Sequence, residues 1–191
     1  KAGYESFGGG LRVVLPLTSG GSNGPSVEAN IRGFDDRRSR GLPFSDNRNS
    51  GVDASLRLLK NDGAMDVLAL AYVQIRDFSA QFNSIAAGRV SASPTLDQFA
   101  VPSTGIGARI ELRPQIGKAS QNSYGDDRQL RLGIDWRRTV GRTRENSNFV
   151  AGLPTRYREA GGSTDTLGAY AETAALLDRL SLTASGRVDH W

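Results

Sequence analysis

The stretch QLRLGIDWR, residues Gln129–Arg137, alternates between two kinds of side chain. Its even-numbered positions are all large and apolar, and its odd-numbered positions are polar, charged or glycine. Successive side chains of a β-strand point to opposite faces, so this pattern predicts a strand with one apolar face and one wet face. The wet face carries Arg131 and Asp135, and such charges are too costly to desolvate for this face to lie in a dry core.

The same alternation recurs along the chain and predicts an all-β protein of antiparallel, up-and-down strands. The apolar positions of each segment carry no charge, whereas the opposite positions carry charges of both signs. A weaker strand is expected at Leu11–Leu17, where Pro16 argues against a central position in the ladder. The other alternating segments are Ser26–Phe34, Gly51–Leu58, Ala64–Arg76, Thr104–Arg113 and Leu180–Trp191.

One segment, Asp165–Leu180, fits two structures. Leu167, Tyr170, Ala171, Ala174 and Leu177 have helical spacing, and Asp165 is a suitable helix cap. A strand is preferred because the next segment needs an antiparallel partner, and because Gly168 weakens a helix interior.

The connections between these segments are predicted to alternate in length. Lys60–Gly63 has the Asp-Gly composition of a tight hairpin turn, and Leu177–Arg179 also indicates a short turn. Long polar loops are expected at Asp35–Ser50, Ser79–Ser103 and Thr139–Asp165. Short turns on one side and long loops on the other are typical of outer-membrane barrels.

Composition allows a membrane barrel but excludes a helical membrane protein. The chain has 191 residues, a length typical of one domain, and 38% of them are hydrophobic. No run approaches the roughly 18 apolar residues of a membrane helix. A barrel strand needs only about 9–11 residues with every second one apolar. Trp136, near a strand end, suits the aromatic belt at a membrane boundary.

A soluble all-β binding or adhesion domain, such as a β-sandwich, is the alternative interpretation of the alternation. The apolar positions are rich in alanine, glycine and small β-branched residues, which fill a sandwich core poorly but are acceptable against fluid lipid. The segments have similar lengths, with no helix packed between them. Both features favour the transmembrane barrel, while the aromatic content of 7% gives only a thin interfacial belt.

Several segments in a fixed order resemble the mid-barrel region of TonB-dependent receptors. GAYAE at Gly168–Glu172, followed after a tight turn by LTASGRVD at Leu182–Asp189, is similar to a hairpin that recurs in these barrels. The resemblance covers about 85 residues, from Gly107 to Trp191. The other segments that carry it are Gly107–Pro114, Leu130–Arg138, Gly141–Glu145 and Gly152–Gly162.

The resemblance implies an outer-membrane receptor with a barrel of about 22 strands and a plug domain in its lumen. Such a receptor captures a scarce ligand, of the siderophore, cobalamin or oligosaccharide class, and an inner-membrane TonB partner acts on the plug. Residues 1–191 are interpreted as a partial barrel of about eight strands without a plug or TonB box, since neither end has the pattern of a natural terminus. With two open edges, the isolated chain is expected neither to insert stably nor to transport.

Arginines in two predicted loops are the candidate ligand-facing residues, because guanidinium forks match carboxylates and phosphates. The alternative is that they are solvated and bind nothing specific. These candidates are Arg142, Arg144, Arg156 and Arg158, with Arg37 and Arg38. Membrane lipid and lipopolysaccharide are the expected partners, and the small ligand is not identified.

Other functions find little support in the sequence. No nucleic acid is expected as a partner, since the basic residues lack an aromatic platform. The chain has no cysteine and one histidine, His190, so no metal site, cofactor or catalytic triad is expected. Glu28 and Asp53 could in principle form a glycosidase-like pair, but their place on strands fits a lumen lining better.

Overall fold

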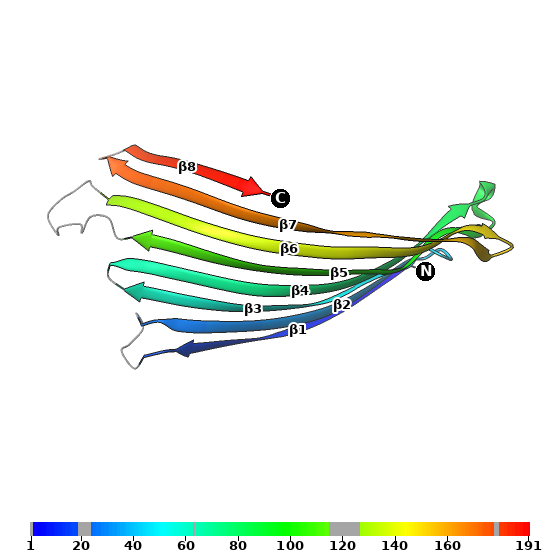
Figure 1. The fold of residues 1–191 in the computed structure, drawn as a ribbon. Helices are drawn as coiled ribbons and strands as arrows, with labels where there is room; N and C mark the ends of the chain where they lie inside the picture. The colour runs from blue at the N-terminus through cyan, green and yellow to red at the C-terminus, as the bar shows by residue number, and fades with distance from the viewer. Residues whose placement is uncertain (1, 19–23, 63, 115–126, 178–179) are drawn as a thin grey trace.

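The computed structural model describes residues 2–18, 24–62, 64–114, 127–177 and 180–191. They form one curved, single-layer sheet in which every strand is antiparallel to its sequence neighbours (Figure 1). The strands are β1 (Ala2–Pro16), β2 (Ser26–Arg40), β3 (Asn47–Asp62), β4 (Met65–Ile85), β5 (Ala92–Pro114), β6 (Asp127–Val150), β7 (Leu153–Leu177) and β8 (Leu180–His190), with a 3-10 turn, η1 (Ala87–Arg89), before β5. The prediction of antiparallel, up-and-down strands is confirmed. Of the segment Asp165–Leu180, residues 165–177 belong to β7, Leu180 begins β8, and residues 178–179 lie outside the described residues.

The register joins the predicted apolar positions into one continuous surface, which we call the apolar face. Val27 pairs with Leu58, and Ile110 pairs with Ile134. Among the described residues, only Ala80 is a buried hydrophobic residue, and Ile134 remains 54% exposed. The apolar rows therefore do not meet one another in a closed interior, as they would in a sandwich. A surface of this kind requires another apolar phase to cover it.

The apolar face ends where the first charged residue appears on each strand, and this boundary crosses the strands obliquely. The first charged residue on this face is Asp35 in β2 and Asp77 in β4, which share one register row. In β6 the first charged residue on this face is Arg138. Its register row passes through Ile106 in β5 and Val73 in β4, and Val73 is four residues before Asp77. A bilayer that crosses tilted strands produces this offset, since barrel strands tilt by about 35–45°.

The prediction of three long loops is wrong, because most of the residues in these segments belong to strands. The ends of β2 and β3 are joined by residues 41–46, those of β4 and β5 by residues 86–91, and those of β6 and β7 by Ala151 and Gly152. We call the strand residues beyond Asp35, Asp77, Arg138 and Asp165 the projecting part of the sheet. Both of its faces carry polar side chains with scattered apolar ones, so it shows no regular apolar alternation from which strands could be recognised.

The hairpin between β6 and β7 has a two-residue turn at its projecting end. Ala151 and Gly152 have φ angles of 51° and 82°, and Val150 pairs directly with Leu153. Two consecutive positive φ angles are the geometry of a type I′ turn, whose twist matches that of the flanking strands. Alanine in the first position is unusual there, which explains why the sequence did not predict this turn.

At the opposite end, the predicted short turns lie partly outside the described residues. The register pairs Asp62 with Met65 and Leu177 with Leu180, so each connection contains two residues. Gly63, Asp178 and Arg179 themselves are outside the described part, as are residues 19–23 and 115–126 of the two other connections. Pro16 is the last residue of β1, as its chemistry predicts.

Candidate functional site

Opposite charges on the polar face are joined across strands. Asp53 in β3 accepts a bond from Arg76 in β4 at 2.5 Å and one from Arg32 in β2 at 3.3 Å. Arg57, which shares the wet side of β3 with Asp53, lies 3.8 Å from Glu28 in β2. Residues four apart on a strand are about 13 Å apart, so pairing along the strand is excluded by geometry.

Glu28 is the centre of a second cluster on the same face. It is 7% exposed and accepts hydrogen bonds from Arg12 and Asn30, each at 2.8 Å. Asp53 lies in the other cluster, where Gln74 also donates to it at 3.1 Å. The two carboxylates considered for glycosidase chemistry are thus each occupied by arginine and amide donors.

The most extensive cluster surrounds Glu111 in β5, which is 2% exposed. Tyr170 of β7 donates to one carboxylate oxygen at 2.5 Å, and Arg113 donates to the other at 2.7 Å. Arg109 also donates to Glu111, and Arg131 of β6 lies 3.6 Å away. The carboxylate is satisfied from three strands, so this network fixes their mutual register.

Arg187 ties three strands together near the end of the chain. Its guanidinium donates to both oxygens of Asp135 in β6, at 2.7 and 3.0 Å, and to Asp189 in β8 at 2.6 Å. To reach Asp135 it passes over Gly168 of β7, where a Cβ atom would lie 2.2 Å from the guanidinium nitrogen. Glycine is therefore required by the close approach of this side chain.

Two tyrosines of the polar face lie flat over glycines of the neighbouring strand. A Cβ atom at Gly107 would lie 2.6 Å from Tyr72, and one at Gly133 would lie 2.3 Å from Tyr170. The register places each tyrosine directly opposite its glycine. The polar face is therefore a wall on which these two rings lie close against the backbone of the next strand.

A recess of about 510 Å³ lies on this wall between the Glu28 and Asp53 clusters. Asn30, Arg32, Tyr72 and Gln74 contribute polar side chains to it. These side chains could contact a polar surface placed against the wall.

The six arginines proposed from the sequence are on strands, and the structure divides them between the two sides of the sheet. Arg142 and Arg144 of β6 lie on the side that continues the apolar face, at 3.1 and 3.4 Å from Glu159 of β7. Arg37 of β2 is on the same side, 3.3 Å from Asp35. They do not form one cluster with the remaining three.

Arg38, Arg156 and Arg158 lie on the side that continues the polar face. Arg38 stacks over the ring of Tyr4 at 5.1 Å, and Arg158 forms an ion pair with Glu145, which is 3% exposed. Arg156 pairs in register with an uncharged residue, Ser147. The sequence could not separate the two sets, because parity has a meaning only once these segments are known to be strands.

Glu159 is also hydrogen-bonded by Tyr157, at 2.7 Å. This bond, with the nearby Arg142 and Arg144, holds the pKa of the Glu159 carboxyl below its ordinary value. The same bond to Glu159 raises the pKa of the Tyr157 hydroxyl.

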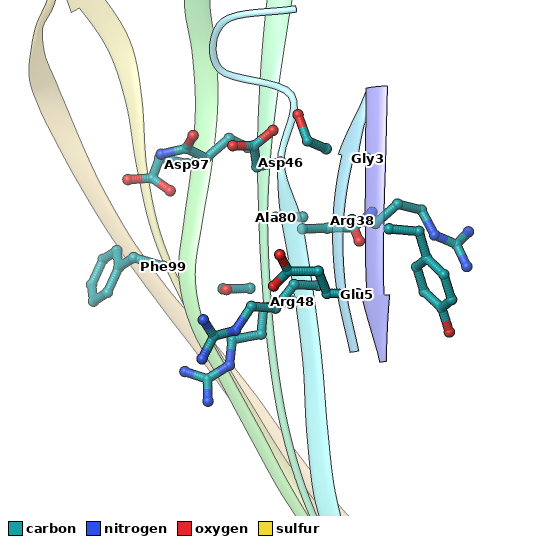
Figure 2. Close-up of a pocket in the computed structure, with 14 residues that line it drawn as sticks. Gly3, Glu5, Arg38, Asp46, Arg48, Ala80, Asp97 and Phe99 are labelled. Atoms are coloured by element: carbon teal, nitrogen blue, oxygen red, sulfur yellow. The ribbon is translucent and has the colours of Figure 1, made fainter. Parts of the chain in front are cut away.

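The sequence did not predict a groove of about 670 Å³ that crosses β1 to β5 in the projecting part (Figure 2). Its residues include Glu5, Arg48, Asp97 and Phe99. Arg48 shares a register row with Arg37, two residues beyond Asp35 and therefore on the same side of the sheet, so the groove opens on the side that continues the apolar face. Figure 2 shows Glu5 and Arg48 side by side in the groove, whereas Arg38 points away from it.

These features define a class of protein. A single-layer sheet with an uncovered apolar face, an ion-paired polar face and strands of up to 25 residues is a segment of transmembrane β-barrel wall. The polar face then lines the lumen. Among the described residues, none belongs to a helix that is long and apolar enough to cross a membrane.

The family model described as "TonB dependent receptor-like, beta-barrel" matches residues 1–191. The chain therefore belongs to the TonB-dependent receptor β-barrel family, a family of outer-membrane receptors. The comparison with curated proteins and the comparison with solved structures each gave no match. The family, the outer-membrane location and the barrel fold predicted from the sequence are confirmed, and the soluble alternative is set aside.

Proposed function

We propose that residues 1–191 form part of the barrel wall of a receptor that takes up a scarce ligand across the outer membrane. The separation of the two faces by strand register supports this proposal: one face suits lipid, and the other suits an aqueous lumen that holds a plug domain. TonB acts on such a receptor through the plug, so its contact is made outside this part of the barrel. The recess lined by Asn30, Arg32 and Gln74 offers polar groups to the plug surface.

The ligand we propose is anionic, and the ferric siderophore class fits this requirement best. Arg38, Arg156 and Arg158 are on the lumen side of the projecting strands, where an incoming ligand passes. Guanidinium groups bind carboxylate and similar oxygen pairs in a bidentate manner. Uncharged oligosaccharides and cobalamin gain less from three arginines.

The other partners are membrane lipid and lipopolysaccharide. The apolar face is proposed to contact acyl chains. Arg37, Arg142 and Arg144 lie just beyond it on the same side, at the level where lipopolysaccharide carries its phosphates. On this proposal, three of the six arginines contact the cargo and the other three contact the membrane.

The test compares two double variants of the full-length receptor in cells. Arg156→Gln with Arg158→Gln should lower uptake at limiting ligand about tenfold, the effect of losing one charge-assisted hydrogen bond. Arg142→Gln with Arg144→Gln removes the same charge from the opposite side and should leave uptake unchanged. Equal loss in both variants would show that the side of the sheet does not decide contact with cargo.

A further inference from the structure

We propose that the groove across β1 to β5 binds the phosphorylated saccharide headgroup of an outer-leaflet glycolipid. The inference rests on the proposed orientation of the apolar face toward lipid. It assigns to Glu5, Arg48, Asp97 and Phe99 a role in holding lipopolysaccharide against the outside of the barrel.

The position of the groove selects a membrane molecule over cargo. The row of Arg37 and Arg48 lies two residues, about 7 Å, beyond the row of Asp35, the first charged residue of β2 on the apolar face. The groove is therefore directly above the lipid-covered surface and on its side of the sheet. A solute in the lumen is separated from it by the thickness of the barrel wall.

The chemistry of the groove suits a sugar with phosphate groups. Phe99 is 43% exposed, and its ring centroid is 6.3 Å from that of Tyr157, which together give an apolar platform for a sugar ring. The carboxylates of Glu5, Asp46 and Asp97 form no ion pair or side-chain hydrogen bond within the described part of the chain. They are available to accept hydrogen bonds from sugar hydroxyls.

Arg48 supplies the phosphate-binding group. Its Nε and Nη2 donate to the two oxygens of Asp35 at 2.9 and 2.7 Å, which fixes the guanidinium plane and leaves Nη1 free of that contact. A guanidinium held in this way is pre-organised for a phosphate oxygen. The groove combines arginines with carboxylates, so a polyhydroxylated headgroup fits it better than a simple anion.

The experiment uses the full-length receptor purified from outer membranes in mild detergent. The groove variant is Asp97→Ala with Phe99→Ala, and the matched control is Phe82→Ala, which removes a ring of similar exposure (39%) from β4 outside the groove. Lipopolysaccharide retained per receptor is measured by phosphate analysis and native mass spectrometry. Binding of lipid A–core, of deacylated core oligosaccharide and of phosphatidylglycerol vesicles is then titrated.

The groove variant should retain about tenfold less lipopolysaccharide, the effect of losing one hydrogen bond to a charged group. It should bind lipid A–core and deacylated core more weakly, bind phosphatidylglycerol as before, and keep wild-type cargo uptake and heat-modifiable mobility. Phe82→Ala should match the wild type. Equal retention in the groove variant and the control would overturn the proposal.

A groove variant that loses cargo uptake but retains lipopolysaccharide would also overturn it, by assigning the groove to cargo. Failure of the proposed uptake function is measured separately, in the Arg156 and Arg158 variants. Those variants carry an intact groove and should retain lipopolysaccharide as the wild type does.

Discussion

The part of the sheet that carries the apolar face, which we call the membrane band, has the same backbone structure as the projecting part but a different sequence pattern. In β6, residues 129–137 alternate strictly, whereas residues 138–150 are mostly polar on both sides, yet one strand runs through both. This difference shows that alternation of apolar and polar residues depends on the surroundings of the two faces of a strand. A strand can therefore form without it. On the proposed orientation, the pattern appears where lipid covers one face and disappears where water covers both.

The largest expected effect comes from placing one charge in each part. Ala71→Arg puts a guanidinium at the middle of the apolar face and should destabilise the barrel by about 2–4 kcal/mol, the cost at a bilayer midplane. Ser163 in β7 lies on the same side of the sheet as Ala71 but in the projecting part. Ser163→Arg should therefore lower the stability of the barrel by only about 0–1 kcal/mol. Urea unfolding of the full-length receptor in lipid vesicles measures both. Similar losses would mean that both positions face the same solvent.

The second prediction concerns packing on the lumen wall. Gly133→Ala places a Cβ atom 2.3 Å from the ring of Tyr170, so the ring must move and its hydrogen bond to Glu111 is lost. We expect a destabilisation of about 1–3 kcal/mol, typical of overpacking. Gly162→Ala is the control, because nothing lies within 4 Å of its Cβ position.

A double variant sharpens this result. Adding Tyr170→Ser to Gly133→Ala removes the ring that clashes, so the two losses should be far from additive. Strict additivity, measured in the same urea titration, would exclude a clash as the cause.

The smallest expected effect is a pH dependence at the projecting end of β6 and β7. The pKa of Glu159 is lowered in the folded state by Tyr157, Arg142 and Arg144. Its contribution is therefore complete above the ordinary glutamate pKa of about 4.3 and is lost as the pH falls through the lower folded value. The amide protection factors of this hairpin, which are corrected for the intrinsic pH dependence of exchange, should be constant from neutral pH to about 5 and should fall below about 4.

Glu159→Gln is the control for this measurement. It should remove the acid-dependent change and leave the exchange of the membrane band unaltered. A pH dependence that persists in Glu159→Gln would have to come from another carboxylate.

The sequence was sufficient for the membrane band and insufficient for the projecting part. The parity of Leu130 and Ile134 correctly placed both on the apolar face, because a continuous apolar face imposes a strict constraint on every second residue. It could not place Arg142 and Arg158 on opposite sides, because both sides of that segment tolerate arginine.

Cross-strand partners were also beyond reach from the sequence. Pairing of Asp135 with Arg187, two strands away, depends on register and on the space above Gly168. Likewise, the groove combines residues from β1 to β5 that only the register and twist of the sheet bring together.

Site-directed labelling of adjacent positions tests the two-faced wall most directly. Residues 1–191 contain no cysteine, so single cysteines at Ile134 and Asp135, and at Thr143 and Arg144, add no second thiol to this part of the barrel. Each is labelled with a fluorophore in a full-length receptor whose other cysteines, if present, are replaced. We predict that nitroxide-labelled lipid quenches the label at Ile134 strongly and the label at Asp135 weakly, while both labels in the projecting part remain unquenched. Equal quenching at Ile134 and Asp135, or stronger quenching at Asp135, would contradict the assignment of the apolar face to lipid.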